Sequence, residues 1–241
     1  MLQLEFKSST PLHVQLKMLI EKKIAEGELT GQIPSERNFM DIYHVSRSTI
    51  REAINLLVRE GVLEKRHGAG TFVSLKPIHQ WLGNLTSTTE VIRQMGMRPG
   101  AKLITHYKLT PPSYIQEKTG FSEAYFVKRV RYADGVPIGV ECHYYPIHIG
   151  KELSKYNLND VTLYDIQQNE LGILFAEADQ TIGSGIITNA DADLLKVPKQ
   201  LHVLIAERLI KDHGGNTVEF EKAYYRSDMY NFHINLSRKF G

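Results

Sequence analysis

The segment that follows Ser46 carries the strongest folding signal in the sequence, because its apolar residues recur with the spacing of one amphipathic helix. These residues stand at i, i+3, i+4, i+7 and i+8 and run to a terminating glycine: Ile50, Ala53, Ile54, Leu57, Val58 and Gly61. The stripe must be buried against neighbouring elements, so the polar residues of this helix must face outward. Arg47 and Arg51 are one helical turn apart and therefore project together from that outward face.

Two further helix starts precede this helix, and a short hairpin follows it. Thr10-Pro11 and Pro34-Ser35 are the start signals, and His44-Val45 forms a two-residue corner before the arginine-bearing helix. Residues 62–65 and 71–73 are extended and joined through two glycines, which favours a tight hairpin. This order predicts a winged helix-turn-helix domain over residues 1–73. The alternative interpretation is a solvated charged face with no nucleic-acid partner.

The first turn of such a helix can reach the base edges of double-stranded DNA. Arg47 and Arg51 can fork onto guanine, and the hydroxyls of Ser48 and Thr49 can bond a base or a phosphate. Residues 1–76 hold 11 Lys and Arg against 9 Asp and Glu, which is the whole of the net charge of +2. So small an excess predicts modest non-specific affinity, with operator binding resting on two half-sites bound by a dimer.

Four runs of residues mark this domain: Pro34-Ser35-Glu36-Arg37, Val45 to Ala53, Gly61-Val62-Leu63 and His67 to Val73. Together they resemble the winged helix-turn-helix of GntR-type bacterial transcription regulators. The resemblance implies that Arg37, Arg47, Thr49 and Arg51 contact operator DNA. It also implies that the wing tip at His67 and Gly68 enters the minor groove.

The rest of the chain has a different organisation. Residues 74–84 show no periodicity, and we interpret them as a linker in which Trp81 is a packing anchor. From residue 85 to residue 241, extended segments mix with helical ones, which predicts an α+β domain with an antiparallel sheet. The extended segments are expected at 102–109, 125–133, 136–145, 202–212 and 218–225, and the helices at 163–171 and 189–196.

Polar residues of this second domain are spaced for an anion site. Ser87-Thr88-Thr89-Glu90 has the form of a capping box, and Thr162 to Asp165 is a second helix start of the same kind. Arg129 and Arg131 are two positions apart in a strand, so both guanidiniums lie on one face. Such a pair needs an anionic partner, which can be either a ligand or surface carboxylates.

Glu141 lies on the strand that returns from Asp134-Gly135, and two registers are open. A strict two-residue loop places Glu141 opposite Lys128, on the other face from the arginines. A glycine bulge with one extra residue places Glu141 across from Arg129.

The motifs of the second domain are Leu85-Thr86-Ser87, Gly96 to Gly100, Val127 to Arg131, Pro137-Ile138 and Tyr225 to Asp228. They resemble the UTRA effector domain of the HutC-like branch, which implies a fold similar to chorismate lyase. In relatives that sense amino-sugar phosphates, the matching positions that hold phosphate are Thr88, Thr89, Arg129, Arg131, Thr162 and Tyr164. The positions that hold the sugar are Glu141, Glu219 and Tyr225.

Composition excludes several other classes of protein. The chain has 241 residues and 42% hydrophobic residues, which is globular, and a single cysteine, Cys142, which excludes an intrachain disulfide. It shows no membrane-spanning stretch and no secretory signal at its start, so we expect a cytoplasmic protein. Neither a metal nor a cofactor is predicted, since a strand places His143 and His148 on opposite faces.

These observations predict a homodimeric transcription regulator that binds double-stranded operator DNA. We expect a repressor of sugar uptake or catabolism genes that a phosphorylated sugar or amino sugar releases. An amino acid or organic acid as effector is one alternative. A second is an enzyme with a DNA-binding appendage, in which Glu141 and Glu219 form an acid/base pair.

Overall fold

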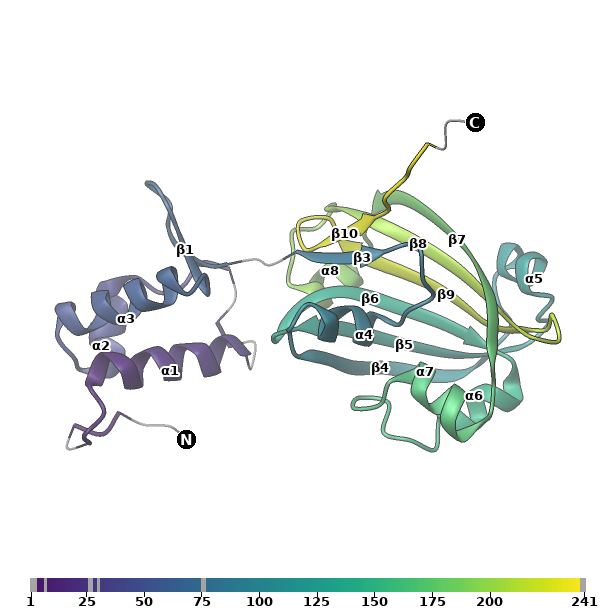
Figure 1. Cartoon of the computed structure of the whole chain (residues 1–241), viewed down its shortest axis with the longest axis horizontal. Helices are drawn as coiled ribbons and strands as arrows, with labels where there is room; N and C mark the ends of the chain where they lie inside the picture. Colours follow the sequence, from purple (N-terminus) through teal and green to yellow (C-terminus); the bar gives the residue numbers. More distant parts are fainter. Residues whose placement is uncertain (1–3, 7, 26–27, 30, 75–76, 239–241) are drawn as a thin grey trace. The chain divides into compact units, whose positions relative to one another are not determined.

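The computed structural model describes residues 4–6, 8–25, 28–29, 31–74 and 77–238. The chain divides into two compact units, one within residues 1–76 and a larger one made of residues 77–133 and 137–241. Figure 1 shows a helical unit with a β-hairpin and a second unit built on a curved sheet with helices. The predicted α+β class is confirmed for the chain.

The first unit is the predicted winged helix-turn-helix. It contains α1 (Leu12–Ala25), α2 (Glu36–Tyr43), α3 (Arg47–Arg59), β1 (Leu63–Arg66) and β2 (Gly70–Val73). The predicted apolar stripe of α3 is buried with α1 residues such as Leu16 and Ile20. Ser35 and Ser46 cap α2 and α3, and His44 adopts a left-handed conformation with φ 53° that turns the chain between the two helices.

The second unit is a six-stranded sheet in the order β4-β5-β6-β9-β8-β7. The strands are β4 (Pro99–Leu109), β5 (Ala124–Ala133), β6 (Val136–Tyr145), β7 (Phe175–Ile186), β8 (His202–Asp212) and β9 (Thr217–Arg226). The helices are α4 (Thr88–Gln94), α5 (Ser113–Thr119), α6 (Ile147–Leu153), α7 (Leu163–Asp165), the π-helical turn η1 (Ile166–Glu170) and α8 (Asn189–Leu195). Among the described helices, none is long and apolar enough to cross a membrane.

Apolar side chains cover both faces of this sheet, which leaves its central strands buried. On one face, Val127 and Tyr145 pack against α6 and α7 residues such as Leu153 and Leu163. On the other face, Val130 and Val140 pack against α8. Because side chains alternate along a strand, the residues that share the face of Val127 also face the helices of the α6 and α7 side.

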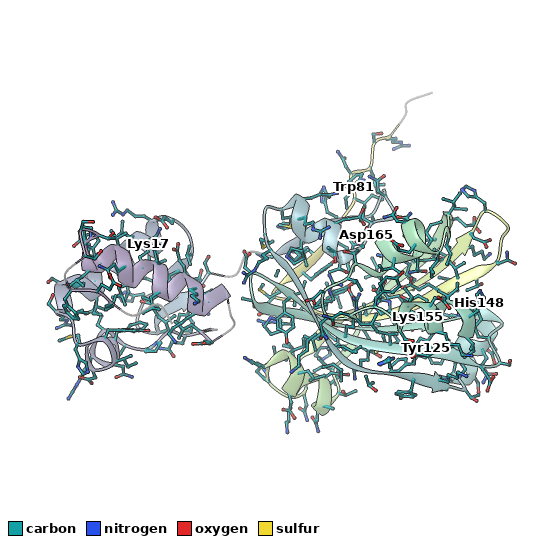
Figure 2. The ribbon with its side chains drawn as sticks, turned by 90° about the horizontal axis from the view of Figure 1, so that it is seen from below. Lys17, Trp81, Tyr125, His148, Lys155 and Asp165 are labelled. Atoms are coloured by element: carbon teal, nitrogen blue, oxygen red, sulfur yellow. The ribbon has the colours of Figure 1, made fainter. Side chains whose placement is uncertain are left out.

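The predicted linker is wrong for its second half. Residues 78–81 form strand β3 (Ile78–Trp81), which pairs in parallel with β10 (Tyr230–His233) near the C-terminus. Residues 75 and 76 lie outside the described residues, and Pro77 already belongs to the second unit. Trp81 lies on β3, is 40% exposed and packs against His233 at 5.6 Å between ring centroids, so it is an anchor of this small sheet (Figure 2).

The β5–β6 hairpin combines features of both predicted registers. Its loop has two residues, Asp134 and Gly135, both with positive φ, as the first register requires. Glu141 nevertheless lies 3.5 Å from both Arg129 and Arg131, on the arginine face. A strict two-residue register would place Glu141 on the other face, so the pairing shifts by one residue between the turn and Glu141.

Candidate functional site

The first candidate site is the exposed N-terminal turn of α3. Ser46 Oγ accepts a hydrogen bond from the backbone N of Thr49 at 3.2 Å and lies 2.8 Å from Ser48 Oγ and 2.9 Å from Thr49 Oγ1. The side chains of Arg47 and Arg51 are 71% and 63% exposed. The turn therefore presents three hydroxyls and two guanidiniums, all of which can bond phosphates or base edges.

Glu36, at the start of α2, binds both arginines of this turn. Its Oε2 lies 2.8 Å from Arg47 Nε, and its Oε1 lies 3.6 Å from Arg51 Nε. One carboxylate thus orients two guanidiniums that extend from a neighbouring helix. Exposed ion pairs of this kind are weak, so phosphates can take the place of Glu36 without a large cost.

The hairpin of β1 and β2 is the wing of this unit. Gln32 Nε2 donates a hydrogen bond to the carbonyl of Ala69 at 2.7 Å, which ties the wing to the segment before α2. Gly70 has φ +116°, a conformation that favours glycine, and a Cβ there would also lie 2.7 Å from Gln32 Nε2. The guanidinium of Arg66 stacks over the Phe72 ring at 4.4 Å.

All the predicted DNA-binding residues lie in the first unit. Arg47, Ser48, Thr49 and Arg51 lie together on α3. Thr49 is half-buried, whereas the others are exposed, including Arg37 on α2 and the wing turn at His67 and Gly68. Their contact with operator DNA stays a prediction.

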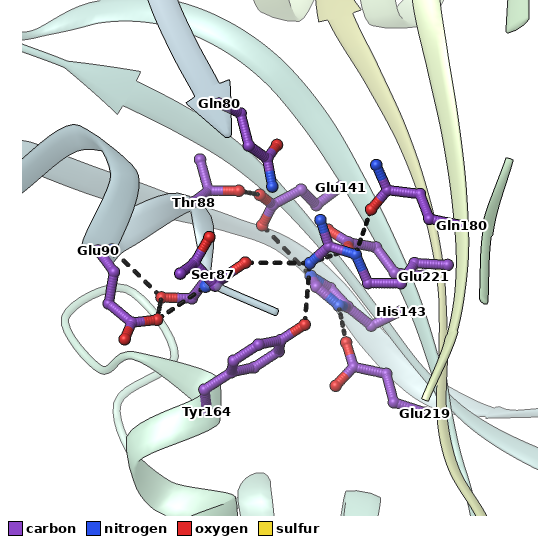
Figure 3. A network of polar contacts seen from close by, with 12 residues as sticks. Gln80, Ser87, Thr88, Glu90, Glu141, His143, Tyr164, Gln180, Glu219 and Glu221 are labelled. Atoms are coloured by element: carbon purple, nitrogen blue, oxygen red, sulfur yellow. Dashed lines mark hydrogen bonds and ion pairs between the residues drawn. The ribbon is translucent and has the colours of Figure 1, made fainter. Parts of the chain in front are cut away.

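The second candidate site is a cavity of about 20 Å³ on the α4 side of the large sheet, which we call the inner cavity (Figure 3). It is lined by Leu163 and otherwise by hydroxyl, basic and acidic side chains: Ser87, Thr88, Thr89, Arg129, Arg131, Glu141, His143, Thr162, Tyr164, Arg208 and Glu221. An outer cavity of about 210 Å³ shares Thr89, Arg131 and Thr162 with it. The two cavities therefore form one site with a buried end and an open end.

Two arginines of β5 reach the inner cavity from the sheet. Arg129 and Arg131 are 2% and 3% exposed, and each places a guanidinium nitrogen 3.5 Å from Glu141 Oε2. Arg131 Nη2 also donates to Thr89 Oγ1 at 2.6 Å. Burial and the neighbouring Arg131 lower the pKa of Arg129, with Glu141 opposing them.

The two arginines retain hydrogen-bonding capacity. Among the described residues, no acceptor reaches the buried Nε of Arg129 or of Arg131. Buried donors of this kind cost free energy unless they are paired, so an anionic ligand would stabilise the site.

Glu141 is the common partner on β6. Its Oε1 accepts a hydrogen bond from Thr88 Oγ1 at 2.6 Å and lies 3.3 Å from the Tyr225 hydroxyl. Burial alone would raise the pKa of Glu141, but the charges of Arg131, His143 and Arg129 outweigh burial and hold the pKa well below its usual value. Glu141 is therefore a carboxylate at neutral pH.

His143 lies behind Glu141 and joins it to Glu219. Its Nδ1 lies 2.7 Å from Glu219 Oε1, and its Nε2 lies 3.3 Å from Glu141 Oε2. Burial opposes protonation, but the hydrogen bonds to Glu141 and Glu219 raise the pKa of His143 to about 9. Gln167 Nε2 donates to the other oxygen of Glu219 at 3.0 Å.

Arg208, on β8, ties three parts of the site together. Its Nη1 lies 3.1 Å from the carbonyl of Thr86 and 3.0 Å from the Tyr164 hydroxyl, and its Nε lies 2.6 Å from Gln180 Oε1. Glu221 approaches the same Nη1 at 3.6 Å. Arg208 therefore holds the segment before α4 and helix α7 against the sheet.

The structure brings most of the predicted effector residues together. The inner cavity is lined by Thr88, Thr89, Arg129, Arg131, Glu141, Thr162 and Tyr164. Glu219 lies outside the lining, behind His143, and Tyr225 reaches the site through Glu141. The capping box at Ser87 is confirmed. A helix also starts after Thr162 as predicted, but the Thr162 side chain makes no capping hydrogen bond.

Sequence reasoning missed three lining residues with ionisable side chains: His143, Arg208 and Glu221. Two of them had a signal, because His143 stands two positions from Glu141 and Glu221 stands two positions from Glu219. Alternation along a strand places each pair on one face. Arg208 had no comparable signal, since nothing in its neighbourhood separates it from an exposed arginine.

One group within the site has the composition of a metal site. Donor atoms of Glu141, His143 and Glu221 all lie within 4.8 Å of one another. Even with a neutral His143, however, the lining carries three positive charges, on Arg129, Arg131 and Arg208, against two carboxylates, Glu141 and Glu221. This balance favours an anion over a divalent cation. His148 is exposed on α6, away from the cavity (Figure 2).

Comparisons with known proteins match each of the two units to a family. The family described as "Bacterial regulatory proteins, gntR family" matches residues 12–73, and the family described as "UTRA domain" matches residues 94–231. The HTH-type transcriptional repressor NagR of Bacillus subtilis (strain 168) is 31% identical over 231 residues, which cover 94% of this chain and 95% of that protein. The mannosyl-D-glycerate transport/metabolism system repressor MngR of Escherichia coli (strain K12) is 24% identical over 236 residues, which cover 95% of this chain and 97% of that protein. The crystal structure of PhnF from Mycobacterium smegmatis aligns with 92% of this chain and 99% of its own, with a TM-score of 0.64 and 25% identity.

Proposed function

Because the chain belongs to the GntR family of bacterial transcription regulators and carries a UTRA domain, we propose that it is a repressor that a phosphorylated amino sugar releases from its operator. The chain is a DNA-binding regulator and not an enzyme. The two relatives named above are repressors, and the name of MngR refers to transport and metabolism of a sugar derivative. We extend that role to this chain and expect its targets to be genes for sugar uptake or catabolism.

The observation that carries the proposed ligand class is the pair of buried arginines with unpaired Nε atoms. Arg129 and Arg131 can bind a phosphate together with the hydroxyls of Thr89 and Thr162. The carboxylate of Glu141 suits the amine or hydroxyls of a sugar. Sites for small molecules usually enclose about 300–1,000 Å³, so even a small ligand must occupy the inner and the outer cavity together.

The ligand class can be tested by thermal shift of the full chain with sugar phosphates, free sugars, inorganic phosphate, amino acids and organic acids. We expect stabilisation by phosphorylated amino sugars and release of operator DNA by the same compounds. Stabilisation by amino acids or organic acids alone would replace the proposed effector class.

The roles of the two units can be separated by substitution. Arg51→Ala is expected to abolish specific operator binding without changing ligand binding. Arg129→Ala is expected to leave operator binding intact and to remove release by ligand; Arg129→Met, which keeps the aliphatic volume, serves as a second variant. Full release from either Arg129 variant would contradict the phosphate site.

We further propose that the protein acts as a homodimer, in which two α3 helices bind the half-sites of a palindromic operator. Sedimentation of the full chain with and without operator DNA tests this assembly, and a monomer bound to a single half-site would contradict it.

A further inference from the structure

We infer that Gln80 and Tyr230 are the positioning residues through which the effector cavity acts on β3, the strand that leads to the DNA-binding unit. This inference deepens the proposed function and rests on it for the identity of the ligand. It starts from a chain of contacts that joins Glu141 to Gln80 through two stacked tyrosines.

The chain begins at a triangle of buried oxygens. Thr88 Oγ1 lies 2.6 Å from Glu141 Oε1 and 3.1 Å from the Tyr225 hydroxyl, and that hydroxyl lies 3.3 Å from Glu141 Oε1. All three side chains are buried. A ligand that takes up hydrogen bonds of Glu141 or Thr88 must compete with this triangle, so its binding changes the partners of the Tyr225 hydroxyl.

The ring of Tyr225 has little space to move by itself. It stacks on Tyr230 with 4.0 Å between centroids and 16° between planes. It also lies against the backbone of Gly139, where a Cβ would stand 2.5 Å from Tyr225 Cδ1. Because packed interiors transmit small displacements, a shift of Tyr225 must move Tyr230.

Tyr230 is tied to β3 by a buried hydrogen bond. Its hydroxyl donates to Gln80 Oε1 at 2.7 Å, and Gln80 is 2% exposed although it is polar. Figure 3 shows the side chain of Gln80 pointing from β3 toward Thr88 and Glu141. A buried, paired glutamine in so short a strand holds that strand in one position relative to the cavity.

The strand β3 is held in position by hydrogen bonds to β10 and its flanking residues. The two strands form a separate sheet of two strands, and the amides of Ile78 and Leu82 donate to the carbonyls of Met229 and His233 at 2.8 and 2.9 Å. A sheet of two strands is only marginally stable alone, so its packing on the rest of the unit holds it in place, including Tyr225 and the Met95 sulfur that lies 3.2 Å from the His79 amide. Since β3 is the first strand of the second unit along the chain, its position sets where the chain leaves toward the first unit.

The first test measures operator release by glucosamine 6-phosphate, with a DNA sequence selected for binding to the full chain. In the double variant Gln80→Leu/Tyr230→Phe, apolar groups of similar shape replace both partners, so folding is retained. In the wild type, glucosamine 6-phosphate is expected to weaken operator binding by about 5- to 150-fold. In the double variant we expect the sugar phosphate to weaken operator binding by less than about threefold. The affinity for the operator without ligand and the affinity for the sugar phosphate should both be unchanged.

Tyr144→Phe is the matched control for this test, because Tyr144 lies on the opposite face of β6 and packs against Phe126 and Phe220. It should release the operator as the wild type does. Wild-type release from the double variant would overturn the inference.

The second test needs no ligand. Amide hydrogen exchange at Ile78 and Leu82 is compared in the wild type and in Thr88→Val, which removes the hydroxyl of the triangle. We expect exchange to be faster by about tenfold. Tyr225→Phe is expected to give the same change, because it removes the other hydroxyl that contacts Glu141 Oε1. Thr119→Val is the control, since Thr119 is 8% exposed, close to the 7% of Thr88, but lies on α5.

The two tests separate the two possible failures. If glucosamine 6-phosphate does not release the wild type, the proposed ligand is wrong, and hydrogen exchange still decides the role of Gln80 and Tyr230. Unchanged exchange at Ile78 and Leu82 in both cavity variants would overturn that role, whichever ligand binds.

Discussion

The protonation of His143 predicts a specific loss of stability at alkaline pH. His143 is 3% exposed, and its hydrogen bonds to Glu141 and Glu219 raise its pKa to about 9 from an ordinary value of 6.5. A raised pKa means that the charged imidazole stabilises the folded state. This contribution is complete below about pH 6.5 and is lost as the pH rises through about 9. At about 1.4 kcal/mol for each tenfold change in proton affinity, the loss amounts to about 3 kcal/mol.

Urea unfolding, followed by tryptophan fluorescence, measures this loss of stability in the second unit, which contains His143. Trp81 is the single tryptophan of the chain and lies in the second unit, so its emission reports on that unit alone. The wild type should be more stable than His143→Gln at pH 6. The difference between their free energies of unfolding should be about 3 kcal/mol larger at pH 6 than at pH 9.5. His148→Gln, at an exposed histidine, should show no such pH dependence. An equal difference between wild type and His143→Gln at both pH values would refute a charged, buried His143.

Three further predictions concern the DNA-binding unit. Glu36→Gln removes the carboxylate that orients Arg47 and Arg51. The affinity for non-specific DNA should therefore rise, and the ratio of specific to non-specific affinity should fall. DNA titrations at two salt concentrations measure both. Gly70→Ala places a Cβ against Gln32 at an unfavourable φ and should destabilise this unit by about 1–3 kcal/mol in a circular dichroism melt. Leu57→Ala empties a fully buried position and should cost about 2–5 kcal/mol in the same melt, whereas Arg51→Ala, at an exposed position, should leave the midpoint unchanged.

The DNA-binding unit could be predicted from sequence because its signals are local. The apolar stripe of α3 and the capping residues Ser35 and Ser46 each act within a few positions, and the structure forms them as expected. The Glu36 contact to Arg47 and Arg51 joins two helices at an angle that no spacing in the sequence specifies.

The effector unit was less predictable because its signals are not local. Strand β7 escaped notice, since the segment Phe175–Ile186 is polar, contains two glycines and lies at an exposed sheet edge without apolar alternation. Residues 78–81 seemed to belong to a linker because the strand with which they pair lies about 150 residues later. The place of Glu141 depended on a one-residue shift in its hairpin, which the turn residues do not specify.

The parallel pairing of β3 with β10 also bears on how the chain folds during synthesis. The core of the first unit is drawn from residues 16–73 and can form once those residues have left the ribosome. β3 is synthesised directly afterwards but must wait for residues 230–233, which are made about 150 residues later. Each nascent chain therefore carries a completed DNA-binding unit well before its effector unit can close, so a chain cut short before Tyr230 would retain the recognition helix without a means of closing the second unit.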